Sequence, residues 1–391
     1  MSNALAVLLN ETVDEAKDRE RTAFDNIAGD AANRLVLFGA GGLGQRTLRA
    51  LREQGIEPLA FADSNAKRWG ATQDGIPILS PKDAADRYGD SATFVVTIWG
   101  GLGIDRMNDR IAHLRELGCA RVTSFVPLYW KYPDSLIPHY GADFAHKTLQ
   151  QRDEVIAAYE LFIEEASRRE YEAQIRWRLH ADFEALPAPV SHPIYFPKDL
   201  CDLRDDEVFV DCGAFDGDTV DLFIRESDGQ FESLIAFEPD PSNFKLLAER
   251  VASYPEAIRN RIALKQAATG STPGMVSMAA DGLPSSAVGS GDHLVHSIVL
   301  DEALENATYL KMDIEGSEID TLKGAAGIIR KCRPALAVCV YHKQDDLWKI
   351  PLLIHGIQPG YSFFLRPHLN EMWDLVCYAI PNERLKSRMD N

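Results

Sequence analysis

The sequence predicts an α/β protein with two doubly wound, Rossmann-like domains that are joined by a helical segment. Apolar, strand-like runs alternate with helical segments in two separate parts of the chain, residues 34–117 and the residues from 207 onward. Each part begins with a strand, a glycine-containing turn and a helix, and this alternation indicates a parallel sheet. We therefore expect an N-terminal domain at 1–140, a helical bridge at 141–200 and a C-terminal domain at 201–391.

The composition is that of an ordinary globular protein, with 46% hydrophobic and 26% charged residues among 391. The formal charge of −18 argues against a nucleic-acid partner, because phosphate contacts need clustered lysine and arginine. The apolar start, residues 4–9, is too short to span a membrane and runs into acidic residues. We expect a cytoplasmic protein with no export signal and no integral membrane association. The six cysteines form no C-x-x-C pair, which argues against zinc and disulfides.

The N-terminal domain opens with a glycine pattern that is typical of nucleotide-binding sites. A strand at 34–38 leads into Gly39, Gly41 and Gly44 in the spacing G-x-G-x-x-G. Asp63 ends the next strand, about 20 residues beyond Gly44, where it would suit a ribose 2′-hydroxyl and repel a 2′-phosphate. Further strands are expected at 58–62, 76–79 and 94–98, with helices at 45–54, 81–88 and 104–117.

This glycine pattern leaves three interpretations open. The domain binds a nucleotide or nucleotide-sugar, it binds NAD, or it is a structural Rossmann-like domain without a ligand. No tyrosine–lysine pair or other hydride-transfer arrangement is evident after Trp99, so the sequence does not decide between them.

The segment at 143–185 contains apolar residues at helical spacing and predicts one or two long helices between the domains. The run Leu186-Pro187-Ala188-Pro189 then ends the helix. The apolar positions are Val155, Tyr159, Phe162, Ile163 and Ala166, followed by Tyr171, Ile175, Leu179 and Phe183.

The start of the C-terminal domain is the most informative stretch of the chain. The strand at 207–211 ends in Asp211, a turn with Gly213 and Gly217 follows, and the next strand ends in Glu238. Glycines let the backbone approach a ligand, and the second acid binds ribose hydroxyls. Because Asp211 can face a cationic ammonium group and no third glycine serves a pyrophosphate, the pattern favours S-adenosylmethionine over a dinucleotide.

A further group of acids follows the strand at 308–313. Asp313 stands at the end of that strand, and Glu315 and Glu318 follow within one turn that contains Gly316. Ligands of open α/β sheets bind at the carboxyl ends of strands, so these acids are candidates for a site. The alternative is that Asp313 caps a helix and Glu318 is solvated. His342 ends the next strand, and we expect it to lie near Asp313.

Two strand-like runs, 361–366 and 373–379, are separated by only a few polar residues near the end of the chain. They predict a closing hairpin that adds an antiparallel strand at one edge of the sheet. The other strands of this domain are expected at 207–211, 233–238, 262–266, 308–313 and 335–341.

Ordered blocks of the C-terminal domain match one known family. They are Asp211-Cys212-Gly213-Ala214, Gly217-Asp218-Thr219, Phe237-Glu238-Pro239, the run from Lys311 to Glu318, Leu322-Lys323-Gly324-Ala325, Tyr341-His342 and Tyr378-Ala379-Ile380-Pro381. With these blocks, residues 205–380 resemble the FkbM family of S-adenosylmethionine-dependent methyltransferases. The resemblance implies a class I methyltransferase fold and methylation of a hydroxyl on a sugar or polyketide-type acceptor. The chain departs from the commonest glycine turn at Phe215 and Asp216, so Asp216 either contacts cofactor or only shapes the turn.

The strand-end positions and the resemblance together suggest roles for individual residues. We expect His342, Asp313 and Glu315 to face the acceptor, with His342 as the proposed base. The same three residues are the candidate ligands of Mg²⁺, if a metal ion takes part. Ser285 and Ser286 either approach the adenine or belong to a plain surface loop. The expected cofactor-binding residues are Asp211, Gly213, Ala214, Asp216, Gly217, Thr219, Glu238, Pro239 and Asp313.

We expect an S-adenosylmethionine-dependent O-methyltransferase whose acceptor is a sugar, a glycoconjugate precursor or a related small molecule. One alternative is an NAD-linked oxidoreductase or a nucleotide-sugar-binding protein that works through the second nucleotide site, Gly39, Gly41, Gly44 and Asp63. Another is a non-catalytic protein that senses S-adenosylmethionine or nucleotides. The sequence leaves the acceptor and the oligomeric state open.

Overall fold

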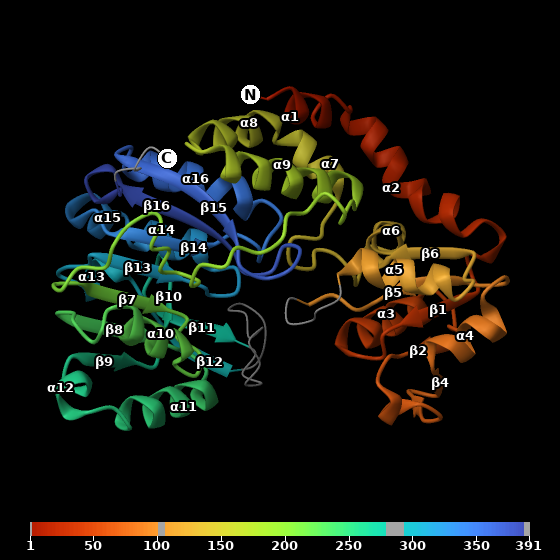
Figure 1. The fold of residues 1–391 in the computed structure, drawn as a ribbon, viewed down its shortest axis with the longest axis horizontal. Helices are drawn as coiled ribbons and strands as arrows, with labels where there is room; N and C mark the ends of the chain where they lie inside the picture. Colours follow the sequence, from red (N-terminus) through yellow and green to blue (C-terminus); the bar gives the residue numbers. More distant parts are fainter. Residues whose placement is uncertain (1, 101–105, 279–292, 387–391) are drawn as a thin grey trace. The chain divides into compact units, whose positions relative to one another are not determined.

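A computed structural model describes residues 2–100, 106–278 and 293–386. The chain divides into two compact units (Figure 1). The N-terminal unit comprises residues 1–153, 170–188 and 369–373, and the C-terminal unit comprises 154–169, 189–368 and 374–391. No helix in the described part of the chain is long and apolar enough to cross a membrane. Each unit contains a sheet with mostly parallel strands, which confirms the predicted α/β class.

The sheet of the N-terminal unit has the strand order β3-β4-β2-β1-β5-β6. All of its neighbouring strands are parallel except β3, which pairs antiparallel with β4. The chain passes from the central β1 to β2 on one side and later to β5 on the other, so the unit is doubly wound as predicted. The strands are β1 (Leu35–Phe38), β2 (Ala60–Ala62), β3 (Thr72–Gln73), β4 (Ile76–Leu79), β5 (Thr93–Val96) and β6 (Arg121–Ser124).

Three helices connect these strands. Helix α3 (Gly42–Glu53) begins three residues before the predicted position 45, because the glycine turn itself forms the first helical turn. Helix α4 (Pro81–Tyr88) lies at the predicted residues, with the Ser80 side chain accepting from the Asp83 N–H and proline in the first turn. Helix α5 (Met107–Glu116) lies within the predicted helix at 104–117, whose first residues fall outside the described part of the chain.

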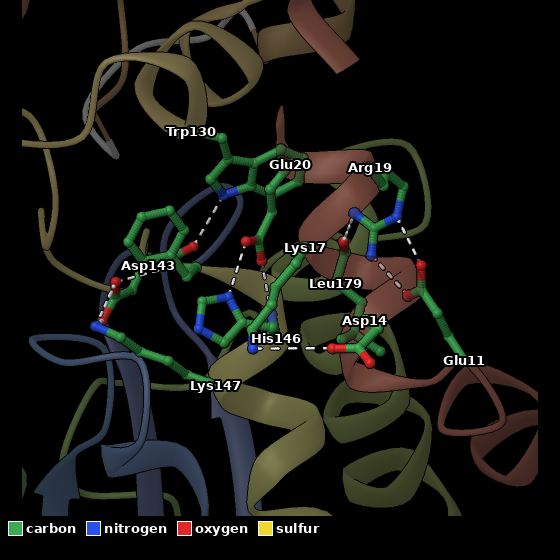
Figure 2. A network of polar contacts seen from close by, with 11 residues as sticks. Glu11, Asp14, Lys17, Arg19, Glu20, Trp130, Asp143, His146, Lys147 and Leu179 are labelled. Atoms are coloured by element: carbon green, nitrogen blue, oxygen red, sulfur yellow. Dashed lines mark hydrogen bonds and ion pairs between the residues drawn. The ribbon is translucent and has the colours of Figure 1, made fainter. Parts of the chain in front are cut away.

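A long amphipathic helix that the sequence analysis did not anticipate packs on this unit. Helix α2 (Val13–Ala28) buries Glu20, whose carboxylate accepts hydrogen bonds from the backbone N–H of His146 (2.7 Å) and faces its Nδ1 (2.8 Å). Figure 2 shows this pair beside Arg19, which donates to the carbonyl of Leu179 (2.6 Å). The other helices of this unit that precede α7 are α1 (Asn3–Leu8), α6 (Phe125–Lys131) and the short η1 (Gly29–Ala31) and η2 (Ala66–Arg68).

The predicted helical segment consists of three helices, α7 (Ala145–Gln150), α8 (Arg152–Leu161) and α9 (Glu165–His180), where one or two were expected. The break after α8 arises because Phe162 forms a β-bridge with Phe363 and the Ile163 N–H donates to the Phe363 carbonyl (3.3 Å). No glycine or proline marks this break in the sequence. The residues of the predicted bridge at 141–200 are divided between the two units.

The sheet of the C-terminal unit has the order β15-β16-β14-β13-β7-β8-β9. The five strands predicted from β7 to β14 are parallel, and the hairpin of β15 and β16 closes one edge, as expected. Within that hairpin β16 is antiparallel to both β14 and β15. The strands are β7 (Val208–Cys212), β8 (Ser233–Phe237), β9 (Ile262–Lys265), β13 (Tyr309–Met312), β14 (Ala335–Cys339), β15 (Tyr361–Pro367) and β16 (Leu375–Pro381).

A second, three-stranded sheet in this unit was not predicted. Its order is β10-β12-β11, formed by β10 (Ala268–Thr269), β11 (Gly274–Met278) and β12 (His293–Ile298). Ser285 and Ser286 lie outside the described residues. The helices of the unit are α10 (Asp218–Glu226), α11 (Pro241–Ala252), α12 (Glu256–Arg259), α13 (Leu300–Ala303), α14 (Glu318–Gly324), α15 (Ala326–Cys332), α16 (Asp346–Ile357) and η3 (Asn382–Arg384).

Candidate functional site

The predicted acids of the C-terminal unit lie at one edge of the seven-stranded sheet. Asp211 is the fourth residue of β7, Glu238 directly follows β8, and Asp313 directly follows β13. These three strands are immediate neighbours and parallel, so their carboxyl ends coincide. His342 follows the next strand, β14, at the same edge. The structure therefore brings together residues that are widely separated in the sequence.

The turn after β7 has a backbone that only a few residue types tolerate. Gly213 and Gly217 have φ values of 84° and 91°, and Phe215 has φ 47°. A Cβ atom on Gly213 would lie 1.9 Å from the carbonyl oxygen of Asp313, so this turn packs directly on the end of β13. Asp216 forms an ion pair with Arg250 (2.7 Å), which supports the view that it shapes the turn.

Glu238 fastens this turn to the end of β8. One carboxylate oxygen accepts from the N–H of Phe215 (2.8 Å) and the other from the N–H of Asp240 (2.9 Å). Burial raises the pKa of Glu238 to about 7, although both N–H donors act in the opposite direction. A carboxylate has about four acceptor positions, so each oxygen retains one for a further donor such as a ribose hydroxyl.

Asp211 is fully buried and forms an ion pair with Lys311, with Oδ1 and Nζ 3.1 Å apart. The register of β7 and β13 places the two residues directly opposite each other. Lys311 also donates to the carbonyl of Gly213 (2.5 Å), so it links the base of the turn to the acid beneath it. Lys311 was not among the predicted site residues, although a lysine inside the apolar run of β13 was a signal for it. The assignment of Asp211 to the amino-acid end of a cofactor stays a prediction.

Asp313 is surrounded by donors. The hydroxyl of Tyr195 donates to Oδ2 (2.7 Å), and the hydroxyl of Tyr341 and Nε2 of His342 both lie 3.4 Å from Oδ1. Burial tends to raise the pKa of Asp313, but Lys311, His342 and the Tyr195 hydrogen bond together lower it. Tyr195 belongs to the proline-rich stretch before β7, and nothing in its sequence context pointed to the site.

His342 is the centre of the acidic group. Its Nδ1 lies 2.9 Å from Oε1 of Glu318, and its Nε2 faces Asp313 (3.4 Å) and Glu315 (3.7 Å). Burial disfavours a charged ring, but the carboxylates, Glu318 first, raise the pKa of His342 to about 10. Glu318 is fully buried and also accepts from the Ile314 N–H (2.9 Å), so the alternative in which it is solvated is wrong. Helix α14 likewise has no side-chain cap from Asp313.

The more exposed members of this group are Asp313 and Glu315, whose side chains are 23% and 20% accessible against 2% for His342. Burial raises the pKa of Glu315 to about 7. Asp374, which the sequence analysis missed, accepts from the Tyr341 hydroxyl, and burial raises its pKa to about 7 as well. Tyr195, Glu315 and Asp374 all have positive φ, as Phe215 does, and such strain in non-glycine residues is typical of functional sites.

The donor set also resembles a metal site. Ligand atoms of Asp313, Glu318 and His342 all lie within 4.8 Å of one another. Glu318 faces Nδ1 whereas Asp313 faces Nε2, however, so an ion bound to one ring nitrogen lies away from the carboxylate at the other. Glu315 shares the Nε2 side with Asp313. The predicted set of Asp313, Glu315 and His342 stays a prediction.

Of the other predicted residues, Ala214 and Thr219 are buried and Pro239 is half-buried. The Ala214 N–H donates to the Phe237 carbonyl (3.0 Å), and the Thr219 N–H donates to Asp218 (2.6 Å). Both residues thereby hold the loop between β7 and α10. Their contact with a ligand stays a prediction.

The N-terminal unit repeats the same construction. Asp63, at the end of β2, accepts from the N–H of Ala40 in the glycine turn (2.9 Å) and from the N–H of Asn65 (2.8 Å). A Cβ on Gly44 would lie 1.9 Å from the Gly39 carbonyl oxygen, whereas Cβ atoms on Gly41 and Gly42 would meet no atom within 4 Å. Packing therefore requires a glycine at position 44. At Gly41, by contrast, the backbone is open to a ligand. The ligand of this unit stays a prediction.

In a comparison with protein families, residues 211–377 match the methyltransferase FkbM domain. These residues form an FkbM methyltransferase domain. The match begins at Asp211 and contains all of the acids described above for the C-terminal unit, and it confirms the resemblance found in the sequence.

Among solved structures, methyltransferase FkbM from Methylobacillus flagellatus KT is similar to this chain, with 23% identity, a TM-score of 0.75 and coverage of 94% of this chain and 100% of that one. At this identity the likeness shows a shared fold, which extends beyond the FkbM domain into the N-terminal unit. Two further structures have TM-scores too low to carry an argument. They are a putative rRNA methylase from Clostridium thermocellum (11% identity, 46% and 89% coverage, TM-score 0.31) and a fibrillarin pre-rRNA processing protein from Methanococcus jannaschii (12%, 48% and 72%, 0.32). No curated protein sequence matches the chain.

Proposed function

We propose that the FkbM domain is an S-adenosylmethionine-dependent O-methyltransferase that acts on a hydroxyl of a sugar, a glycoconjugate precursor or a related small molecule. The observation that supports this most is the meeting of Asp211, Glu238 and Asp313 at the carboxyl ends of three adjacent strands. In open α/β sheets this edge is where ligands bind. We place the activity in the cytoplasm, because all six cysteines are free thiols, as expected in a reducing compartment.

The residues at this edge fit the cofactor. Glu238 keeps acceptor positions for the two ribose hydroxyls, and the positive-φ glycines Gly213 and Gly217 let the turn pass close to a ligand. The ion pair with Lys311 fixes the side chain of Asp211, which is proposed to lie at the amino-acid end of the cofactor. The cofactor would supply a methyl group on a sulfonium. The protein then has to hold an acceptor oxygen in line with that methyl group and take part in removing its proton.

Asp313, Glu315 and His342 are proposed to face the acceptor. The partly exposed side chains here are carboxylates, Asp313, Glu315 and Asp374, while His342 is buried behind them. A negatively charged acceptor would be repelled by these groups, so an uncharged or cationic acceptor is favoured. A general base among these groups, if it accepts the proton of the acceptor hydroxyl, typically contributes on the order of 10²–10⁴-fold to the rate.

Calorimetry of the full chain with S-adenosylmethionine and S-adenosylhomocysteine tests the cofactor assignment. We expect both to bind, and Glu238→Gln to weaken both at least about tenfold, because charged hydrogen bonds contribute about 1.5–3 kcal/mol each. Glu249→Gln, an exposed change on α11, is the matched control. Absence of binding by the unaltered protein would refute the assignment.

The acceptor class is tested separately by transfer of a radiolabelled methyl group from S-adenosylmethionine to glucose, glucosamine and glucuronic acid, which share one ring and differ in charge. We expect labelling of glucose or glucosamine to exceed that of glucuronic acid. Preferred labelling of glucuronic acid would contradict the charge argument, and transfer to an amine nitrogen instead of an oxygen would contradict O-methylation.

For the N-terminal unit we propose nucleotide or nucleotide-sugar binding, with NAD as the alternative. The open backbone at Gly41 beside the Asp63 carboxylate supports a ribose–phosphate ligand. Trp69, which is 46% exposed and donates from its indole to the Asp63 carbonyl (2.6 Å), is a fluorescent reporter of this position. Titration with UDP-glucose and NAD, with Trp69→Phe as the control, would distinguish the two. If neither UDP-glucose nor NAD changes the Trp69 fluorescence, the result would favour a structural domain without a ligand.

A further inference from the structure

The geometry points to a divalent transition-metal site in the FkbM domain, formed by Nε2 of His342 with carboxylate oxygens of Asp313 and Glu315. This inference rests on the proposed function, since the ion would lie where the acceptor hydroxyl is expected. It differs from a magnesium site, because an imidazole ligand favours ions such as Mn²⁺, Fe²⁺ or Zn²⁺.

The orientation of the ring supports this site. Glu318 lies against Nδ1 (2.9 Å), and it is itself held by the N–H of Ile314 (2.9 Å). Nε2 therefore points to the opposite side, toward Asp313 (3.4 Å) and Glu315 (3.7 Å). A carboxylate on the far nitrogen is the usual arrangement of histidines that bind metal ions, because it fixes the tautomer and the direction of the ring.

The carboxylate ligand is fixed in the same manner. Oδ2 of Asp313 accepts from the hydroxyl of Tyr195 (2.7 Å), which leaves Oδ1 on the side of His342. Tyr195 is in turn held at its N–H by the hydroxyl of Tyr378 (3.0 Å) and at its carbonyl by the hydroxyl of Tyr309. Two of the three ligands are thus oriented by buried partners that do not themselves bind the ion.

A second observation concerns the buried acids around the ring. Glu318 is fully buried, its Oε2 has no hydrogen-bond partner among the described residues, and one of its oxygens lies within 4.8 Å of ligand atoms of Asp313 and His342. Asp346 is buried as well, Lys311 is engaged by Asp211, and a protonated His342 ring would balance only one of these acids. A divalent ion would compensate the charge of more than one carboxylate.

The same site has an open side, because Asp313 and Glu315 are partly accessible. An ion held there would take the acceptor hydroxyl in place of a water and lower its pKa. The hydroxyl proton would leave to solvent, and the oxygen would then bond to the methyl carbon while the electron pair of the carbon–sulfur bond stays on sulfur. His342 would bind the ion through Nε2 and would not have to accept the proton.

The test is Mn²⁺ binding to the full chain, measured by electron paramagnetic resonance and calorimetry after treatment with EDTA. We expect one Mn²⁺ per chain, bound at least about tenfold more tightly than Mg²⁺. Asp313→Asn should abolish binding. Tyr195→Phe and Glu318→Gln, which alter no ligand atom, should each weaken it about 10–100-fold. His355→Gln, an exposed histidine on α16, is the control and should leave it unchanged.

Mn²⁺ binding that is absent, or no tighter than that of Mg²⁺, in the unaltered protein would overturn the inference without recourse to any variant. Equal affinity in the Asp313→Asn and unaltered proteins would overturn it as well. Calorimetry with S-adenosylmethionine in EDTA is run alongside. Cofactor binding without Mn²⁺ binding would refute the metal site alone, whereas failure of the cofactor to bind would refute the proposed function.

Discussion

The hydrogen bond from Tyr195 to Asp313 gives a sharp test of the site's energetics. Tyr195→Phe removes one buried hydroxyl and leaves Oδ2 of Asp313 without its donor at 2.7 Å. Hydrogen bonds to charged groups contribute about 1.5–3 kcal/mol, so we expect a loss of that size in the free energy of unfolding at pH 7. Urea unfolding in EDTA, followed by tryptophan fluorescence, measures it, because Trp348 is buried in the same unit.

Tyr361→Phe is the matched control. Its hydroxyl is also buried in the C-terminal unit but donates to a neutral acceptor, the carbonyl of Pro334 (2.8 Å). A neutral hydrogen bond contributes about 0.5–1.5 kcal/mol, so this variant should lose less. If the two variants lose the same unfolding free energy, the hydroxyl of Tyr195 does not donate to a charged acceptor.

The pH dependence of the difference gives a second check. The pKa of Asp313 is lowered in the folded state, so its negative charge stabilises the fold at pH values above its unfolded-state pKa of about 3.9. This stabilisation is lost as the pH falls through the folded-state pKa. The gap between the Tyr195→Phe and unaltered proteins should therefore be constant from pH 5 to 7 and shrink below about pH 4. A gap that persists unchanged in acid would refute the role of the Asp313 carboxylate.

Three further predictions concern the same domain. Gly213→Ala should lower the melting temperature by several degrees, because its Cβ would lie 1.9 Å from the Asp313 carbonyl oxygen at φ 84°; the exposed Gly356→Ala, where no atom lies within 4 Å, should not. In EDTA, His342 should lower the unfolding free energy by about 1.4 kcal/mol per pH unit between roughly pH 7 and 10, because its folded-state pKa, about 10, exceeds the unfolded value of about 6.5. His342→Gln should make the slope shallower by about that amount, and an unchanged slope would contradict a charged ring. Asp63→Asn should destabilise the N-terminal unit by about 1–3 kcal/mol, because its oxygens accept from Ala40 and Asn65, and hydrogen exchange at Ala40 should report it.

Much of the fold could be predicted because the decisive signals are local. Apolar runs with glycine turns mark β1 and β7, and Asp63 and Glu238 stand where such turns place their acids. The three-stranded sheet was missed, since β10 has only two residues and β11 carries no clear alternation of burial. Helix α2 was missed because it precedes β1 and so lies outside the alternation of strands and helices that marks the domain, although Thr12 and Glu15 form a capping box at its start.

The site was predictable only in its strand-end residues. Lys311 meets Asp211 through the register of two strands about a hundred residues apart, which spacing alone does not reveal. Tyr195 and Asp374 come from a proline-rich connection and a hairpin turn, whose paths depend on tertiary packing. The structure also changes how His342 is understood, because carboxylates occupy the space at both of its ring nitrogens.

The alternation of the chain between its two units has a practical consequence. It passes from one to the other after residues 153, 169, 188, 368 and 373. A fragment starting at 201 would lack Ser167, which accepts from the N–H of Leu365 (2.9 Å), and Glu164, which pairs with Arg366. Strand β15 would then present a bare edge that invites aggregation. A stable fragment of the C-terminal unit therefore has to include residues 154–169, which lie well before the FkbM match in the sequence.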